Sequence, residues 1–177
     1  YRQVWVFDFR SLYPSIMRTF NIDPLAYIRA RQKGTDNGSS DDITAPNGAI
    51  FDRQPGILPD ILARFFEQRS QAKAAGDDLA SFVYKILMNA CYGVLATGTC
   101  RFANNELVGA ITGFGHHFLT WVRDLLEQDG YHVLYGDTDS VFVVSGHSGD
   151  IDAETAHQEA AALCRRVNER LARYITE

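Results

Sequence analysis

The sequence is poor in cysteine, with three among 177 residues. Cys91, Cys100 and Cys164 lack the paired spacing of a zinc site or of a secreted disulfide framework, so we interpret them as reduced thiols. Basic residues are also in the minority, and the net charge is -5. A protein whose whole surface binds phosphates would be basic, so we expect any nucleic-acid contact to be local or to lie outside this sequence.

The chain shows no apolar run that approaches the length of a membrane span, and it has neither a signal peptide nor an initiator methionine. Residues 1–4 instead read as the start of a strand, so we expect a fragment of a longer chain, with no membrane partner. Apolar residues make up 46% of the sequence, which is enough for a core in one domain with a protruding subdomain.

The most informative segment is residues 135–140, Tyr-Gly-Asp-Thr-Asp-Ser, which lies between two apolar runs. We interpret the runs as two strands that meet in a tight Gly-Asp turn. Asp137 and Asp139 are two positions apart and should share a face. Two neighbouring carboxylates repel each other unless a cation or a proton intervenes, and such oxygen ligands suit Mg²⁺. An ordinary turn would also explain them, because Asp hydrogen-bonds to its own backbone there.

A third carboxylate, Asp8, follows the apolar run of residues 4–7, Val-Trp-Val-Phe. This run is typical of a strand buried on both faces, and an acid at its end is costly without a partner. If the strands that carry Asp8, Asp137 and Asp139 are adjacent, the three acids would suit a pair of metal ions in phosphoryl transfer.

The rest of the chain predicts helices separated by turn residues. We expect helices over residues 11–20, 58–75, 79–95, 104–130 and 153–174, with a break at Asp23-Pro24 and a surface loop, with room for a short hairpin, over residues 31–56. The helices over 58–75 and 79–95 form an αα-hairpin because their connection is short. This order indicates an α+β fold, with helices on one face of a small, mostly antiparallel sheet and a protruding helical hairpin.

Cationic and polar residues recur at helical spacing on the predicted hairpin. Arg69 and Lys73 are four apart on its first helix, and Lys85, Asn89 and Tyr92 share one stripe of its second. A solvated face explains such charges in the simplest case. A stripe facing the acids would instead hold a polyphosphate.

The segment after Asp8 can also be interpreted either as a binding site or as ordinary structure. The backbone N–H groups of residues 9–13 lead into a predicted helix and could bind an anion, although many helix starts do not. Tyr13 before Pro14 is equally explained as a core aromatic at a turn.

Three segments together resemble motifs A, B and C of the family B DNA polymerases, in that order: residues 8–16, 85–93 and 135–140. The resemblance extends to residues 56–59 and to the helix of Arg69, and it covers nearly the whole chain outside residues 31–47. Ala90, together with residues 99–102, Thr-Cys-Arg-Phe, is most similar to the bacterial members, the DNA polymerase II group.

The resemblance implies a role for each matching residue. Asp8 and Asp139 would bridge two Mg²⁺ ions, with Mn²⁺ as an alternative, and Phe9 would add its backbone carbonyl while Asp137 supports the site. The list of implied nucleotide ligands is Ser11, Leu12, Tyr13, Arg69, Lys73, Lys85 and Asn89, with the Tyr13 ring as a gate against ribonucleotides. Tyr92, Gly93 and Thr138 would lie by the nascent base pair and the DNA.

The resemblance also implies a reaction and its partners. A primer 3′-hydroxyl would attack a deoxynucleoside triphosphate on primer-template DNA and release pyrophosphate, in the bacterial cytoplasm at the nucleoid. Residues 1–22 and 98–177 would be the palm, and 23–97 the fingers. The exonuclease and thumb domains are missing, so we expect the fragment alone to polymerise poorly or not at all; a sliding clamp is a further candidate partner.

Two other classes remain open at this point. A catalytically silent palm that serves as a scaffold would have lost motif acids, and all three acids are present. Another two-metal palm enzyme, such as a nucleotidyl cyclase or a reverse transcriptase, would lack Lys85 and Asn89 in this register.

Overall fold

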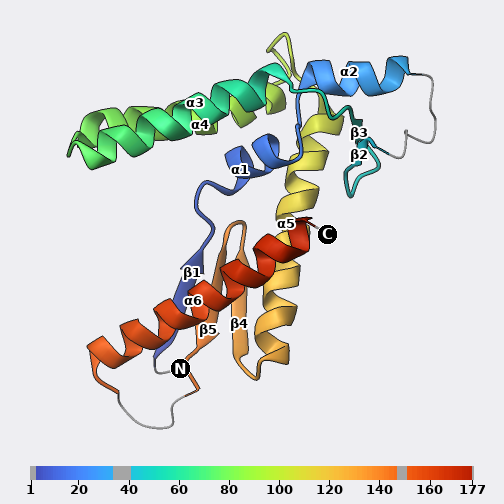
Figure 1. Ribbon diagram of the computed structural model, residues 1–177. Coiled ribbons are helices and arrows are strands. Elements are labelled where there is room, and N and C mark those ends of the chain that lie inside the picture. The colour runs from blue at the N-terminus through green and yellow to red at the C-terminus, as the bar shows by residue number, and fades with distance from the viewer. Residues whose placement is uncertain (1–2, 34–40, 147–150, 177) are drawn as a thin grey trace. The chain divides into compact units, whose positions relative to one another are not determined.

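The computed structural model describes residues 3–33, 41–146 and 151–176 (Figure 1). The chain divides into two compact units. The sheet unit comprises Tyr1–Phe9 and His116–Glu177, and the helical unit comprises Arg10–Gly115. Each unit is described by itself below.

The sheet unit is built on three antiparallel strands in the order β1-β5-β4. Their bounds are β1 Val4–Asp8, β4 His132–Asp137 and β5 Ser140–Val144. Helix α6 (Ala153–Thr176) and the second half of α5 (Asn105–Gln128) cover one face of this sheet. The buried centre is formed by Val122, Leu126, Val141, Val143 and Leu163. The α+β class predicted from the sequence is confirmed.

The two faces of the sheet differ because strand side chains alternate. Trp5 and Phe7 of β1 pack against the helix-covered core. Val6 between them is 55% exposed, and Tyr135 of β4 is 59% exposed. The prediction that β1 is buried on both faces is therefore wrong, because among the described residues helices cover only the Trp5 side. We call the opposite side the open face.

The helical unit contains a long antiparallel hairpin of α3 (Ile57–Ala74) and α4 (Asp78–Ala96), drawn in green in Figure 1. Gly76 takes φ +71° in the turn, and the Asp77 carboxylate accepts a hydrogen bond from the backbone N–H of Ala80 at 2.9 Å. A left-handed residue followed by an Asp cap ends one helix and starts the next. Helix α1 (Leu12–Thr19) packs against both members of the hairpin.

Helix α2 (Pro24–Gln32) lies where the sequence predicted only a break. Pro24 is at the start of α2, where its missing N–H costs nothing. The buried Asp23 carboxylate accepts hydrogen bonds from the N–H of Leu25 at 2.7 Å and of Leu58 at 2.8 Å, so it caps both α2 and α3. A Cβ on Gly56 would lie 2.5 Å from the Cβ of Asp23, so this double cap requires glycine at position 56.

The predicted surface loop carries the short hairpin that the sequence allowed, β2 (Ile43–Thr44) paired with β3 (Ile50–Phe51). It is fixed to α2 by Lys33, whose Nζ lies 2.5 Å from the Asp52 carboxylate and 3.1 Å from that of Asp42. The hydrogen bond from Lys33 lowers the pKa of the buried Asp52, and the same contact raises the pKa of Lys33. Residues 34–40 of the loop lie outside the described residues.

One helix in the described part of the chain, α4, is long and apolar enough to cross a membrane, by length and composition only. The expectation that no stretch approaches such a length is therefore wrong for α4. Its mean hydropathy is 1.4 and only 17% of the window is buried, with Leu79, Phe82 and Ile86 all largely exposed. Lys85 and Asn89 interrupt this apolar surface.

Candidate active site

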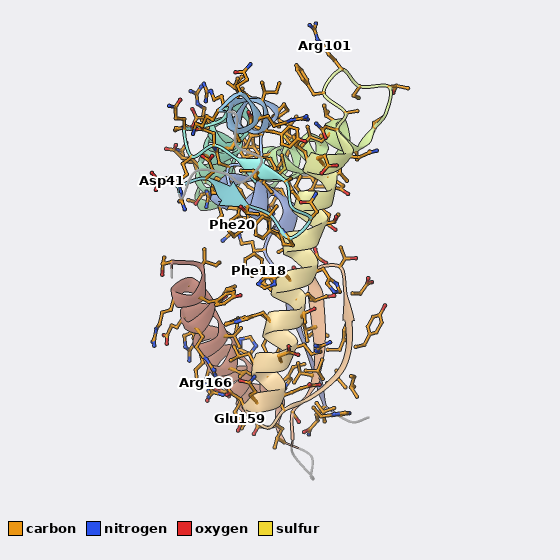
Figure 2. All side chains as sticks on the ribbon, turned by 90° about the vertical axis from the view of Figure 1, so that its right-hand side faces the viewer. Phe20, Asp41, Arg101, Phe118, Glu159 and Arg166 are labelled. Atoms are coloured by element: carbon orange, nitrogen blue, oxygen red, sulfur yellow. The ribbon has the colours of Figure 1, made fainter. Side chains whose placement is uncertain are left out.

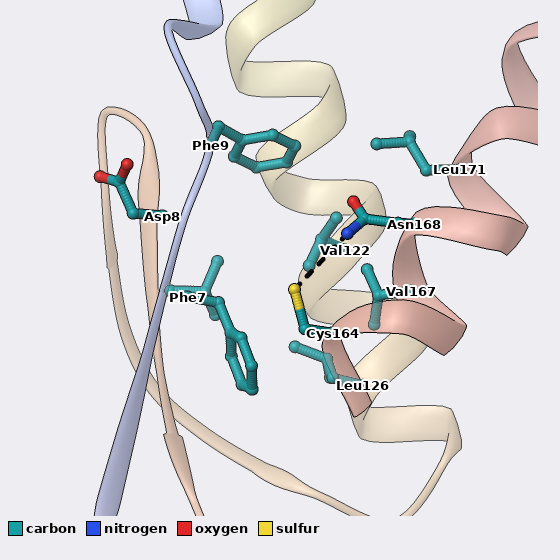
Figure 3. A pocket seen from close by; sticks show the side chains of 10 residues that line it. Phe7, Asp8, Phe9, Val122, Leu126, Cys164, Val167, Asn168 and Leu171 are labelled. Atoms are coloured by element: carbon teal, nitrogen blue, oxygen red, sulfur yellow. Dashed lines mark hydrogen bonds between the residues drawn. The ribbon is translucent and has the colours of Figure 1, made fainter. Parts of the chain in front are cut away.

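Two of the predicted acids lie in one row across the sheet unit. Asp8 of β1 and Asp137 of β4 each pair with Ser140 of the central strand. Residues directly opposite each other in neighbouring strands project to the same face, so both carboxylates belong to the open face. Figure 3 shows Asp8 on the side of β1 away from α5 and α6. Both residues are exposed, and their Cα atoms are two strand spacings apart, about 10 Å.

The third acid, Asp139, lies in the turn between β4 and β5. The turn consists of Thr138 and Asp139, so it begins two residues later than the sequence predicted. The N–H of Phe9 donates to the carbonyl of Asp139 at 2.7 Å, which fixes the turn to the end of β1. The sequence prediction that these strand ends are adjacent is thereby confirmed.

Thr138 has a strained backbone. Its φ is +49°, in the left-handed region that a β-branched residue rarely adopts. The Thr138 hydroxyl lies 3.0 Å from the Asp137 carboxylate, and the Ser140 hydroxyl donates to the Asp137 carbonyl at 3.2 Å. Strain of this kind persists where surrounding structure enforces it, which is common at functional sites.

The acids have the donor chemistry of a magnesium site. Carboxylate oxygens are the ligands that Mg²⁺ prefers, and Asp8, Asp137 and Asp139 all stand at one end of the sheet. Among the described residues, no group of three or more His, Cys, Asp or Glu side chains is arranged to hold a metal ion. The three acids fit a cation by residue type and by their position at one end of the sheet, where the carboxylates of Asp8 and Asp137 are exposed on one face.

The Phe9 side chain, at the end of β1, lines a cavity on the helix-covered side of the sheet. Its ring packs with Phe7 against Val122 and Leu126 of α5, as Figure 3 shows. Asn168 of α6 lines the same cavity. Because the partly buried Phe9 packs on the helix-covered side, Asp8 at the last residue of the strand has its side chain on the open face.

A polar cleft beside Asp137 was missed by sequence reasoning. His116, Thr120 and Arg123 of α5 line it together with Asp137 and Thr138. The three helix residues follow the spacing i, i+4 and i+7, which could have revealed a shared face. The sequence analysis assigned no role to His116.

Two predicted nucleotide ligands of the helical unit are in contact. Nη1 of Arg69 on α3 lies 3.3 Å from the hydroxyl of Ser11. Nε of Arg69 is buried without a hydrogen-bond partner in the described structure. A buried guanidinium nitrogen is costly when unpaired, so this atom suits an added anionic acceptor. Ser11 precedes α1 in a left-handed conformation, with φ +52°.

Tyr13 and Tyr92 form an aromatic pair, with ring centroids 4.7 Å apart and planes inclined at 39°. A Cβ on Gly115 of α5 would lie 3.2 Å from Cε1 of Tyr13, so glycine allows the close approach of the ring to α5. The alternative that Tyr13 is only a core aromatic is not favoured, because the ring is half-buried rather than enclosed. Leu12 beside it is buried.

The remaining predicted ligands are exposed. Lys73 on α3 and Lys85 and Asn89 on α4 have exposed side chains, and a Cβ on Gly93 would meet open space. The Phe65 and Tyr84 rings, 6.0 Å apart, set the register of the hairpin. In an antiparallel pair this register places Arg69 about one helical turn nearer the hairpin tip than Lys85.

Cys91 lies on the same helix as Lys85. Burial raises the pKa of its thiol, and the Sγ donates to the carbonyl of Leu87 at 3.4 Å. A raised pKa keeps the thiol protonated at neutral pH, and a protonated thiol is a poor nucleophile.

The chain belongs to DNA polymerase family B, whose sequence model matches residues 1–176. It is 39% identical to DNA polymerase II of Escherichia coli strain K12 over 95% of this chain and 21% of that protein. It is 32% identical to a DNA polymerase of Thermococcus gorgonarius, over 93% of this chain and 22% of that one.

Solved structures agree with the sequence comparison. The family B DNA polymerase of the hyperthermophilic archaeon Pyrobaculum calidifontis matches with a TM-score of 0.68 and 28% identity, covering 84% of this chain and 21% of that chain. The chain thus spans about a fifth of the length of the relatives that it matches.

Proposed function

We propose that this chain is the catalytic palm and fingers segment of a longer DNA polymerase, which adds a deoxynucleotide to a primer 3′-hydroxyl on a DNA template. The observation that carries the proposal is the row of Asp8 and Asp137 on either side of Ser140, closed by the strained turn at Thr138 and Asp139. The chain belongs to DNA polymerase family B, and carboxylates on one face suit the metal ions of phosphoryl transfer.

The acids of the sheet unit would hold two Mg²⁺ ions, with Mn²⁺ as an alternative. Asp8 and Asp139 are the proposed shared ligands, the Phe9 carbonyl adds a further oxygen, and Asp137 supports the site. Bound there, the ions would lower the barrier to attack on the α-phosphorus and neutralise the leaving pyrophosphate. The hydrogen bond from the N–H of Phe9 to the Asp139 carbonyl keeps these ligands at one end of the sheet.

The helical unit would supply the cations that bind the triphosphate. The unpaired Nε of Arg69 is a donor for a phosphate oxygen, and Ser11 already orients the guanidinium. Lys73 and Lys85 would add charge, and Asn89 a hydrogen bond. The backbone of Ser11, Leu12 and Tyr13 opens α1 and is proposed to cradle the same phosphates.

Sugar selection is proposed for Tyr13. Its ring rests on Tyr92 and approaches α5 at Gly115, so it cannot retreat easily from a 2′-hydroxyl. Tyr92, Gly93 and Thr138 are proposed to lie by the nascent base pair and the DNA.

The partners of the longer chain are proposals as well. The chain spans about a fifth of its relatives, and we propose that exonuclease and thumb domains complete the parent and hold the primer duplex. A sliding clamp is a further candidate partner, and we propose a bacterial cytoplasmic location at the nucleoid.

Primer extension by the full-length polymerase tests the proposal. Asp139→Asn removes a metal ligand while keeping the shape of the turn, so extension should fall by on the order of 10³-fold because several kcal/mol of charge stabilisation are lost. Primer-template binding, measured by fluorescence anisotropy, should change little. Extension that remains near the unmodified level would refute the assignment.

A further inference from the structure

Arg18, in the last turn of α1, lies outside every set of residues proposed for catalysis or nucleotide binding. The carbon at the centre of its guanidinium group lies 4.7 Å from the centroid of the Phe66 ring on α3. Arg18 is exposed, and Phe66 is half-buried. A guanidinium group at this distance is attracted to the face of the ring. The contact joins the end of α1 to α3, and both helices belong to the helical unit.

A second contact joins the same two helices. At the start of α1, the hydroxyl of Ser11 lies 3.3 Å from Nη1 of Arg69 on α3. Ser11 and Arg18 are seven positions apart, which is about two helical turns. Their partners on α3, Phe66 and Arg69, are three positions apart and so lie on one side of that helix. The two contacts together fix the rotation of α3 against α1, which the Ser11 contact alone would leave free.

The helix that carries Arg18 is itself anchored independently of α3. Phe20 (Figure 2) follows the last residue of α1, and its ring stacks on that of Phe114 of α5, with centroids 3.9 Å apart and planes inclined at 8°. Ile16 and Met17 of α1 are buried. Because packing and stacking hold α1 in place, the contact of Arg18 with Phe66 positions α3 rather than α1.

The position of Arg69 needs such support before the nucleotide arrives. Its Nε is buried without a hydrogen-bond partner in the described part of the chain, and an unpaired buried donor is costly. The cost favours any rotation of α3 that returns this atom to water. The stacking of Arg18 on Phe66, one turn away along α3, opposes that rotation.

We propose that Arg18 is a positioning residue for the incoming nucleotide, because through Phe66 it holds α3 in the rotation that presents Arg69 to the triphosphate. Arg18 itself touches no reacting atom. The inference rests on the proposed function, which assigns Arg69 to the phosphates. A guanidinium group that is already in place loses less conformational freedom on binding, so its preorganisation raises the affinity for the nucleotide and leaves the chemical step unchanged.

Single-nucleotide incorporation by the full-length polymerase tests this role. Arg18→Ala should raise the KM for the deoxynucleoside triphosphate about threefold, the size expected for an exposed cation–π contact, with kcat nearly unchanged. Phe66→Leu keeps the charge of Arg18 and removes the aromatic ring, so it should raise KM to a similar extent. Arg18→Lys should retain part of the affinity, because a cation remains beside the ring.

A double substitution tests whether Arg18 acts through Arg69. When Arg69→Ala is already present, adding Arg18→Ala should not raise KM further, because no guanidinium group is left to position. Arg31→Ala is the matched control. The Arg31 guanidinium lies 5.6 Å from the centroid of the Tyr27 ring, which is the same kind of contact on α2, and its loss should leave KM unchanged.

Several results would overturn the inference. An unchanged KM in Arg18→Ala would show that the contact positions nothing, and a fall in kcat without a rise in KM would indicate general destabilisation. A rise in KM for Arg18→Ala beside an unchanged KM for Phe66→Leu would mean that the charge acts on the nucleotide directly. A further rise in KM when Arg18→Ala is added to Arg69→Ala would show that the two residues act independently.

Failure of the proposed function gives a different result. In that case Arg69→Ala by itself would leave the KM for the nucleotide unchanged, and the assignment of Arg69 to the phosphates would be lost together with the role of Arg18. If Arg69→Ala raises KM and Arg18→Ala does not, the proposed function stands and only the positioning role is wrong.

Discussion

The proposed metal ligands of the sheet unit and the proposed phosphate ligands of the helical unit are positioned by different kinds of structure. In the sheet unit, Asp8 and Asp137 are more than 120 positions apart in the sequence and meet in one row because both strands pair with Ser140. In the helical unit, Arg69 and Lys73 share a side because they are four apart on one helix. The relative positions of the acids therefore depend on long-range strand register, whereas those of the cations depend on the local spacing along one helix.

This difference predicts how each half tolerates change. A one-residue slip of β1 against β5 would move every side chain of β1 to the other face and separate Asp8 from Asp137. The helix needs no such pairing to keep Arg69 and Lys73 together. Catalytic rate should therefore respond to the sheet unit, and nucleotide affinity to the helical unit.

The largest effect expected from the helical unit is that of Arg69→Ala. It removes the Ser11 contact and the unpaired Nε, so the KM for the incoming nucleotide should rise about 10- to 100-fold, the equivalent of one charged hydrogen bond. The rate constant kcat should change much less. Steady-state single-nucleotide incorporation gives both constants.

Arg64→Ala on the same helix is the matched control, since Arg64 is exposed and is not assigned to the nucleotide. It should leave both constants near their original values. If Arg69→Ala reduced kcat and left KM unchanged, the proposed division of labour between the two units would be wrong.

The sequence was sufficient for the features that depend on local pattern. The helical hairpin was predicted to within a residue or so at its ends, because Gly76 and Asp77 mark the turn chemically. The α+β class followed from the order of the elements. The adjacency of the strand ends near Asp8 and Asp139 was inferred from charge alone, and the pairing of β1 with β5 confirmed it.

Other features were out of reach because they depend on tertiary contacts. Asp23 caps two helices at once, and its bond to Leu58 spans 35 positions, so Asp23-Pro24 looked like a break rather than a start. The turn was placed two residues early because Thr138 accepts a left-handed φ that Gly would normally supply. Val6 was predicted to be buried because an apolar run does not reveal that one sheet face is open.

A smaller effect is expected from Gly115→Ala, which tests whether packing alone positions the Tyr13 ring. The added methyl would lie 3.2 Å from Cε1 of Tyr13, so the ring must shift by a few tenths of an ångström. We expect discrimination against ribonucleotides to fall by less than tenfold, which corresponds to under about 1.4 kcal/mol. Competitive incorporation of matched ribo- and deoxynucleotides measures it.

Gly113→Ala on the same helix is the control for that substitution. Its methyl would meet Pro46 at 3.4 Å, an ordinary contact away from Tyr13, so discrimination should stay unchanged. Equal effects of the two alanines would mean that α5 acts through general stability and that Tyr13 is not held by close packing. Unchanged discrimination in both would show that the ring tolerates the shift.

The smallest expected effect is a difference between the two units in how acid weakens the protection of their amides. The pKa of Asp52 is lowered below its usual value of 3.8 by the hydrogen bond from Lys33. A lowered folded-state pKa contributes stability that is present above the unfolded-state value and is lost as the pH falls through the folded-state value. Protection of the α2 and β3 amides against hydrogen exchange should therefore weaken below about pH 4, after correction for the intrinsic rate.

Asp152 at the start of α6 is the counterpart in the sheet unit, with its pKa lowered by the hydrogen bond from Thr155. It is exposed and caps one helix end, so acid should loosen only the first turn of α6. Asp52→Asn should remove most of the pH dependence in the helical unit, and Asp152→Asn should remove little from the sheet unit. If acid released the amides of both units together, they would unfold as a single cooperative body, and the separate roles argued for them would have no counterpart in stability.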